Sequence, residues 1–212
     1  MYIYLTRHGE TIWNIDKRTQ GTRDIPLSSR GIRQSEALAE RLADENISTI
    51  YTSILDRAYH TANIIGERIG LQPIQTKELN EVNFGSWEGL TLKEIEAKYP
   101  GRFERFFTDF NYAPDNGESI ASLQSRIRRF IQLIKEKHAD KEDRILIVSH
   151  AYPVRMLIIE LMNFPAEHLF DFQLDNTGIS IIRWDNRNGK NRLMCLNDIC
   201  HLQKHDYVAN PG

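Results

Sequence analysis

The sequence YIYLTRHGET at residues 2–11 decides the fold, because an apolar run leads directly into charged and polar side chains. Residues 2–6 predict a buried strand that ends at Arg7-His8-Gly9. In open α/β folds, ligands bind at the carboxyl ends of the strands. An arginine beside a histidine at that edge indicates a site for an anionic group such as a phosphate, next to a nucleophile or acid–base catalyst. Alone, such a pair is more often structural or simply exposed, so the rest of the sequence has to decide.

A second predicted strand, residues 144–149, also ends in a histidine, His150. Its near-continuous apolar run is typical of a central parallel strand. Parallel strands end at the same edge of a sheet, so we expect His8 and His150 to meet there. Arg57 lies in the opening turn of a helix that follows a third strand, where free N–H groups favour anions. Two histidines and two arginines at one edge repel one another unless an anion lies between them, so the sequence predicts an anion site.

Strand and helix signals alternate along most of the chain. Further strands are expected at 49–52, from 73, at 177–184 and at 192–198, the last two pairing as a hairpin across 186–189. Helices are expected at 31–46, 54–69, 92–99, 103–110, 119–137 and 153–162. The pattern predicts one domain over residues 1–212: a doubly wound three-layer α/β/α sandwich whose mostly parallel central sheet has an antiparallel edge strand, with a helical cap insert at about residues 84–130.

Composition narrows the classes of partner. The chain has 212 residues, a net charge of −2 and no basic block, so we do not expect a nucleic-acid partner. No apolar stretch is long enough to span a membrane, and the amino terminus lacks the regions of a signal peptide. Two cysteines, Cys195 and Cys200, do not form a disulfide framework or a zinc motif. We therefore expect a cytoplasmic protein.

Several separated motifs occur in a fixed order along residues 2 to about 200. They are Arg7 to Asn14, Gln20-Gly21, Asp24 to Gly31, Tyr51 to Ser53 with Arg57-Ala58, Leu79-Asn80-Glu81, Gly85 to Gly89, Gly117-Glu118-Ser119 and Val148-Ser149-His150. Together they resemble the histidine phosphatase superfamily, the phosphoglycerate-mutase-like proteins. The resemblance implies an enzyme that acts on a small phosphorylated metabolite.

The resemblance also implies roles for individual residues. His8 is expected to attack phosphorus and become a phosphohistidine, which divides one difficult step into two. Glu81 is expected to protonate the leaving alkoxide and then to activate water. The phosphoryl oxygens would be held by cationic and amide donors, which replace the usual magnesium ion, so no metal and no cofactor are expected. These donors are Arg7, Arg57, His150 and Asn14.

Each assignment has a plainer alternative. Without the resemblance, Glu81 would be a surface carboxylate like Glu78 or Glu88. Asn14 could merely cap a helix. For Gln20 and Gly21, a substrate contact and a structural role are equally open. Phenylalanines at positions 103, 106, 107 and 110 have helical spacing, which more often indicates a core than a substrate wall.

Two features favour hydrolysis over mutase activity. The segment Gly85 to Gly89 resembles the phosphatase branch, and the stretch from Glu81 to Gly117 lacks the Arg-Arg pair that looks typical of mutases. A mutase must keep water away from its phosphohistidine, and a small cap admits water more easily. A non-catalytic phosphate-binding domain would be expected to lack one of four residues, and all four are present in the sequence: Arg7, His8, Arg57 and His150.

The substrate is less constrained. His150-Ala151-Tyr152 departs from the commoner His-Gly-Gly pattern, and with residues 196–202 it resembles metal-independent phosphoserine phosphatases, in which His201 would reach the substrate carboxylate. Phe84, however, stands where such enzymes have a second histidine. L-phosphoserine is the first expectation, and the alternatives are a broad-specificity or an α-ribazole phosphate phosphatase. The resemblance is also compatible with a homodimer, for which the sequence gives no separate signal.

Overall fold

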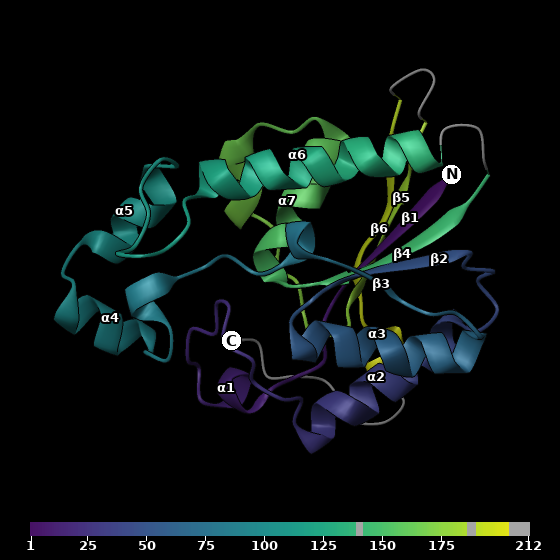
Figure 1. Ribbon diagram of the computed structural model, residues 1–212, viewed down its shortest axis with the longest axis horizontal. Coiled ribbons are helices and arrows are strands. Elements are labelled where there is room, and N and C mark those ends of the chain that lie inside the picture. The colour runs from purple at the N-terminus through teal and green to yellow at the C-terminus, as the bar shows by residue number, and fades with distance from the viewer. Residues whose placement is uncertain (139–141, 186–189, 204–212) are drawn as a thin grey trace.

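The computed structural model describes residues 1–138, 142–185 and 190–203. Its centre is a six-stranded sheet of order β3-β2-β4-β1-β5-β6 (Figure 1). The strands β1 to β4 are parallel, while β5 runs antiparallel to β1 and β6 antiparallel to β5. The prediction of a mostly parallel sheet with an antiparallel edge is therefore confirmed. The strand bounds are Tyr2–Arg7 for β1, Thr49–Ser53 for β2, Ile74–Thr76 for β3, Arg144–Ser149 for β4, Ile179–Arg183 for β5 and Arg192–Asp198 for β6.

Helices cover both faces of the sheet, as Figure 1 shows: α2 and α3 lie on one face, α6 and α7 on the other. Because side chains alternate across a strand, β1 supplies both cores. Ile3 and Leu5 belong to the hydrophobic cluster with α6 and α7, whereas Tyr4 belongs to the cluster with α2 and α3. The helix bounds are Ser29–Leu42 for α2, Asp56–Ile69 for α3, Ile120–Lys137 for α6 and Ala151–Met162 for α7.

The ends of the helices are determined by local capping residues rather than by the hydrophobic pattern. The Ser28 side chain accepts a hydrogen bond from the Gly31 amide, so α2 begins before the predicted residue 31. At the other end of the next helix, Gly70 adopts a left-handed conformation (φ 75°) and stops α3 where the sequence predicted. Helix α7 begins before the predicted residue 153, because Pro153 is tolerated in the first turn.

The insert forms small elements that extend past one end of the sheet. They are η2 (Gly85–Trp87), α4 (Leu92–Lys98) and α5 (Arg102–Thr108). In Figure 1, α4 and α5 lie to the left of the two helical layers, whereas α6 lies beside α7 against the sheet. The part of the predicted insert that reaches outward is therefore its first half.

Some short elements were not predicted from the sequence, because they span about one turn, which is too little for a periodic signal. These are α1 (Ile12–Ile15), η1 (Lys77–Leu79), η3 (Ala166–Phe170) and α8 (Cys200–Gln203). The predicted hairpin turn at 186–189 lies outside the described residues, but the strands on either side of it pair as expected. Cys195 and Cys200 are free thiols. Within the described ranges, no helix is long and apolar enough to cross a bilayer.

Candidate active site

The ends of β1 and β4 bring His8 and His150 together, as the sequence predicted. Arg7 is in register with Ser149, and the His8 amide donates to the Ser149 carbonyl at 2.9 Å. The two imidazole rings lie 5.1 Å apart between centroids, and both are buried. A side chain at Gly9 would place a Cβ 2.4 Å from the Gly31 carbonyl oxygen, so glycine is required there for the strand end to pack against α2.

His8 is held in one tautomer. Its Nδ1 lies 2.7 Å from the Gly9 carbonyl oxygen, and since a carbonyl oxygen can only accept, Nδ1 carries the proton. Nε2 is left with its lone pair, which accepts a hydrogen bond from Arg57 Nε at 3.2 Å. Burial, together with the charges of Arg57 and Arg7, holds the pKa of His8 well below its ordinary value. The side chain is therefore a neutral imidazole with a nucleophilic nitrogen.

Arg57, in the first turn of α3, is fixed by loop carbonyls. Its Nη1 donates to the Arg23 carbonyl and its Nη2 to the Gly21 carbonyl, each at 2.7 Å. Burial lowers the pKa of Arg57 to about 10, which still leaves it charged at neutral pH. Gly21 has a left-handed backbone (φ 55°), and a Cβ there would overlap the Glu88 carboxylate, so its role is to shape this loop.

Arg7 and His150 carry polar nitrogens that the described residues leave unpaired. Arg7 Nη1 donates to the Leu174 carbonyl at 3.1 Å, but its buried Nε has no such partner. Neither ring nitrogen of His150 has one, although the residue is 0% exposed. Burial and the Arg57 charge lower the pKa of His150 well below its ordinary value. Buried polar groups in proteins are nearly always hydrogen-bonded, so this cluster of unpaired nitrogens fits an oxyanion.

Glu81 faces these groups from the loop after η1. Its Oε1 accepts from the Val82 amide at 2.9 Å. Burial raises the pKa of Glu81, while the charges of Arg57, Arg7 and Arg126 oppose that rise. The carboxyl group is thus biased toward its protonated form and lies near cations that can stabilise it when it ionises.

Three groups from elsewhere in the chain anchor the loop that carries Glu81: the Ser149 side chain, the Arg126 side chain and the Glu118 amide. Ser149 Oγ donates to the Leu79 carbonyl at 2.6 Å. Arg126 on α6 donates to the Glu78 carbonyl at 2.6 Å and binds the Glu118 carboxylate through Nε (2.8 Å) and Nη2 (3.1 Å). The Glu118 amide donates in turn to the Asn83 carbonyl at 2.7 Å. The loop is therefore tied down on both sides of the carboxylate.

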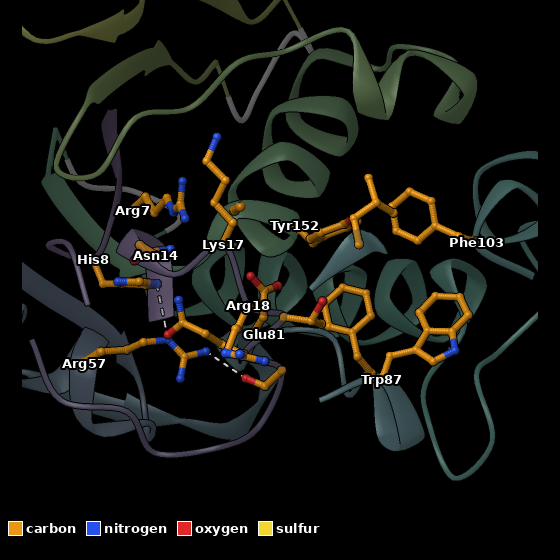
Figure 2. A pocket seen from close by; sticks show the side chains of 16 residues that line it. Arg7, His8, Asn14, Lys17, Arg18, Arg57, Glu81, Trp87, Phe103 and Tyr152 are labelled. Atoms are coloured by element: carbon orange, nitrogen blue, oxygen red, sulfur yellow. Dashed lines mark hydrogen bonds between the residues drawn. The ribbon is translucent and has the colours of Figure 1, made fainter. Parts of the chain in front are cut away.

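Arg7, His8, Arg57 and Glu81 line a cavity of about 250 Å³, the size of a small metabolite site. Figure 2 shows Arg7, His8 and Arg57 at one end, Trp87 and Phe103 at the other, and Glu81 between them. Every predicted site residue except His150 and His201 lines the cavity, and His150 lies behind it against His8. The described residues contain no group of three or more His, Cys, Asp or Glu side chains arranged to hold a metal ion.

Asn14 stabilises the start of α1 and also lines the cavity. Its Oδ1 accepts from the Thr11 amide and from Thr11 Oγ1, both at 3.0 Å, in the capping box of α1. That arrangement leaves Nδ2, a donor, for the cavity that Asn14 lines. Gln20 also lines the cavity, and its buried Oε1 has no partner among the described residues.

His201 is the exception among the predicted residues. It lies on α8, which packs against α2, and its surroundings include Thr177, Asp198 and Arg41. Burial lowers its pKa to about 4. It does not line the cavity, so its position does not support the predicted contact with a substrate carboxylate. The sequence could not show this, because α8 has only four residues and leaves no periodic signal.

Several cavity residues were missed by sequence reasoning. Lys17, whose backbone is left-handed (φ 53°), and Arg18 both line the cavity; Arg18 donates to the Gly89 carbonyl at 2.8 Å and pairs with Glu94. Tyr152 lines it from the first turn of α7. The only sequence signal was the proximity of these residues to the Asn14 and His150 motifs. Among the phenylalanines with helical spacing, Phe106 is core, as favoured, whereas Phe103 lines the cavity.

Comparison with known proteins is consistent with this geometry. The family model described as "Histidine phosphatase superfamily (branch 1)" matches residues 3–198. "Phosphoserine phosphatase 1" of Hydrogenobacter thermophilus is 33% identical over 94% of this chain and 93% of its own length. "Adenosylcobalamin/alpha-ribazole phosphatase" of Escherichia coli is 34% identical over 82% and 86%. Among solved structures, "Bacillus stearothermophilus YhfR" superposes with a TM-score of 0.85 at 32% identity, covering 95% of this chain and 98% of that one.

Proposed function

Because this chain belongs to the histidine phosphatase superfamily and is a phosphatase of that type, we propose that it hydrolyses a small phosphomonoester through a phosphohistidine on His8. The observation that carries this proposal is the tautomer of His8: the Gly9 carbonyl holds the proton on Nδ1, and the lone pair of Nε2 lies beside Arg57. A neutral imidazole next to paired cations suits attack on a phosphoryl group.

In the first step, His8 Nε2 attacks phosphorus in line with the ester oxygen. The N–P bond forms as the P–O bond to the alcohol breaks, and the Glu81 carboxyl gives its proton to the departing oxygen. The Arg57 Nε–H, which donates to His8 in this structure, turns to a phosphoryl oxygen. Arg7, His150 and the Asn14 amide supply further donors, so the charge that develops on the phosphoryl group is stabilised by side-chain N–H groups.

In the second step, water attacks the phosphohistidine. The Glu81 carboxylate left by the first step accepts a proton from that water, the N–P bond breaks, and the electron pair returns to Nε2. Inorganic phosphate leaves, and both residues regain their starting protonation. The raised pKa of Glu81 suits both directions of transfer, because burial favours its protonated form and the nearby arginines stabilise its ionised form.

L-phosphoserine and α-ribazole phosphate, whose ribose alcohol carries an aromatic base, are the two candidate substrates, since relatives of each kind match the chain. The predicted basis for phosphoserine was His201, which lies outside the cavity, while Phe84 lies in its wall. The geometry therefore favours the second candidate, an ester whose alcohol carries an aromatic group. A cytoplasmic location is also proposed, which the two free thiols suit, and a homodimer stays a prediction.

Trapping the intermediate tests the proposed function. The enzyme is mixed with p-nitrophenyl phosphate, quenched in alkali within milliseconds, and its intact mass is measured. We expect a transient gain of one phosphoryl group that maps to His8 and is absent from His8→Ala. A fully active enzyme that never gains this mass, or gains it equally in His8→Ala, would contradict the proposal.

A further inference from the structure

Two aromatic side chains from distant segments meet in the wall of the cavity. Phe84, three residues after Glu81, and Tyr152, two residues after His150, pack edge to face with their ring centroids 5.3 Å apart. Both line the cavity, and Phe84 is 7% exposed. The pair thus connects the loop of the proposed acid to the helix that follows β4, and it presents an apolar surface beside the reacting groups.

The pair is supported from behind by further rings. Phe106, which is 0% exposed, lies 5.6 Å from Phe84 and 6.1 Å from Tyr152, and Phe170 lies 6.1 Å from Tyr152. Close packing of this kind leaves the wall little freedom to rearrange around a polar group. At the end of the cavity away from His8, Trp87 and Phe103 continue the same wall, as Figure 2 shows.

The position of this wall determines what it contacts. The alcohol oxygen of a bound ester must lie near the Glu81 carboxyl to receive its proton, so the carbon attached to that oxygen emerges beside Phe84. The rest of the alcohol then extends along the aromatic side chains toward Trp87 and Phe103. A serine ammonium group would need an acceptor there, and Glu81 is the only carboxylate among the described lining residues.

On the basis of the proposed function, we propose that Phe84 and Tyr152 select phosphomonoesters whose alcohol carries a planar aromatic group on a short linker. The ring would pack against the wall in the edge-to-face or offset geometry that aromatic pairs prefer. Each aromatic contact of this type contributes about a threefold to tenfold gain in binding. We therefore expect an overall preference of about tenfold or more for an ester with such a ring.

The experiment compares esters that differ only in the distal group. 3-Phenylpropyl phosphate and propyl phosphate have alcohols of similar acidity, so their leaving groups are equivalent, and L-phosphoserine is the polar comparison. We expect kcat/KM to be at least about tenfold higher for the phenylpropyl ester than for either other substrate. A wild-type enzyme that prefers phosphoserine, or that does not distinguish the three, would overturn the inference while leaving the phosphatase assignment intact. Hydrolysis of none of the three, nor of p-nitrophenyl phosphate, would overturn the proposed function as well.

Variants show whether this pair causes the preference. Phe84→Leu and Tyr152→Leu are each expected to reduce the ratio of kcat/KM for phenylpropyl over propyl phosphate by about threefold or more. Phe110→Leu is the matched control, since Phe110 belongs to the same aromatic cluster but does not line the cavity, and its ratio should equal the wild-type value. Equal losses on both esters in the two wall variants would show a packing role only and contradict the inference.

Discussion

The two ends of the cavity are built in different ways. The phosphate end is formed where strands stop: His8 and His150 follow adjacent parallel strands, and their spacing is fixed by the ladder between β1 and β4. The alcohol end is formed by side chains from the insert, among them Phe84 and Phe103, together with Tyr152 from the first turn of α7. Backbone pairing positions the two histidines of the proposed reaction, and side-chain packing determines the shape of the cavity around the alcohol. Reaction class and substrate choice are thus properties of different parts of this fold.

The largest effect is expected at the centre of the phosphate end. His8→Ala removes the proposed nucleophile, so kcat for p-nitrophenyl phosphate should fall by about 10⁴-fold or more. The control is His60→Ala on α3, whose exposed side chain should be dispensable. Circular dichroism melting of both variants checks that the fold is intact. Residual activity within tenfold of wild type would remove His8 from the mechanism.

The next effect tests whether geometry or charge alone matters at that end. Arg57→Lys keeps a cation but loses the fork that binds the Gly21 and Arg23 carbonyls and His8 Nε2. We expect kcat to fall by about 10²- to 10³-fold, the usual result of losing one oxyanion donor. Arg68→Lys, on the same helix as Arg57 and in an exposed ion pair with Glu40 of α2, should change kcat by less than about twofold. Full activity in Arg57→Lys would show that a point charge suffices.

A smaller effect is expected in the loop that carries Glu81, which the Arg126 side chain helps to anchor. Arg126→Met removes the anchors at Glu78 and Glu118, so we expect a loss of about 10- to 100-fold in kcat, because small misplacements of a catalytic group are costly. It also leaves Glu118 partly buried without its partner, which should lower the free energy of unfolding by about 3 kcal/mol.

A pH profile separates positioning from simple destabilisation in Arg126→Met. The Arg126 charge holds down the pKa of Glu81, so its removal should raise that pKa further. The limb on which activity declines with rising pH should then move to higher pH. Arg129→Met, which breaks only an exposed pair with Glu78, should leave that limb in place and cost about 1 kcal/mol or less. An unshifted limb in Arg126→Met would show that the network is structural only.

The same contrast explains what the sequence could predict. Strand ends carry strong local signals, so β1, β4 and the meeting of His8 with His150 followed from apolar runs and parallel pairing. The aromatic wall had no such signal, since Tyr152 and Phe84 are far apart in the chain and their contact depends on how α7 packs. Lys17 is placed by a left-handed backbone after a single helical turn, which no periodicity reveals. His201 does not line the cavity, and the sequence could not show this, because a strand predicts an edge of the sheet and not the direction of the turn after it.

The smallest effect on activity is expected at His201, and it tests the boundary between the cavity and its surroundings. Because His201 does not line the cavity, His201→Gln should change kcat/KM for phosphoserine and for p-nitrophenyl phosphate by less than about twofold.

Its effect should appear instead in the pH dependence of stability. Burial lowers the pKa of His201 to about 4, so between about pH 6.5 and pH 4 the unfolded chain binds a proton that the folded chain excludes. Stability contributed by the neutral imidazole is present above pH 6.5 and is lost as the pH falls, by up to about 1.4 kcal/mol per pH unit. His8 and His150 also have lowered pKa values and add to the wild-type slope, so the difference between wild type and His201→Gln isolates one group. Urea unfolding at several pH values between 7 and 4 measures it: the variant should lose less stability on acidification. An unchanged slope with a selective loss of phosphoserine hydrolysis would instead assign His201 to the alcohol end, and substrate choice would no longer be confined to the aromatic wall.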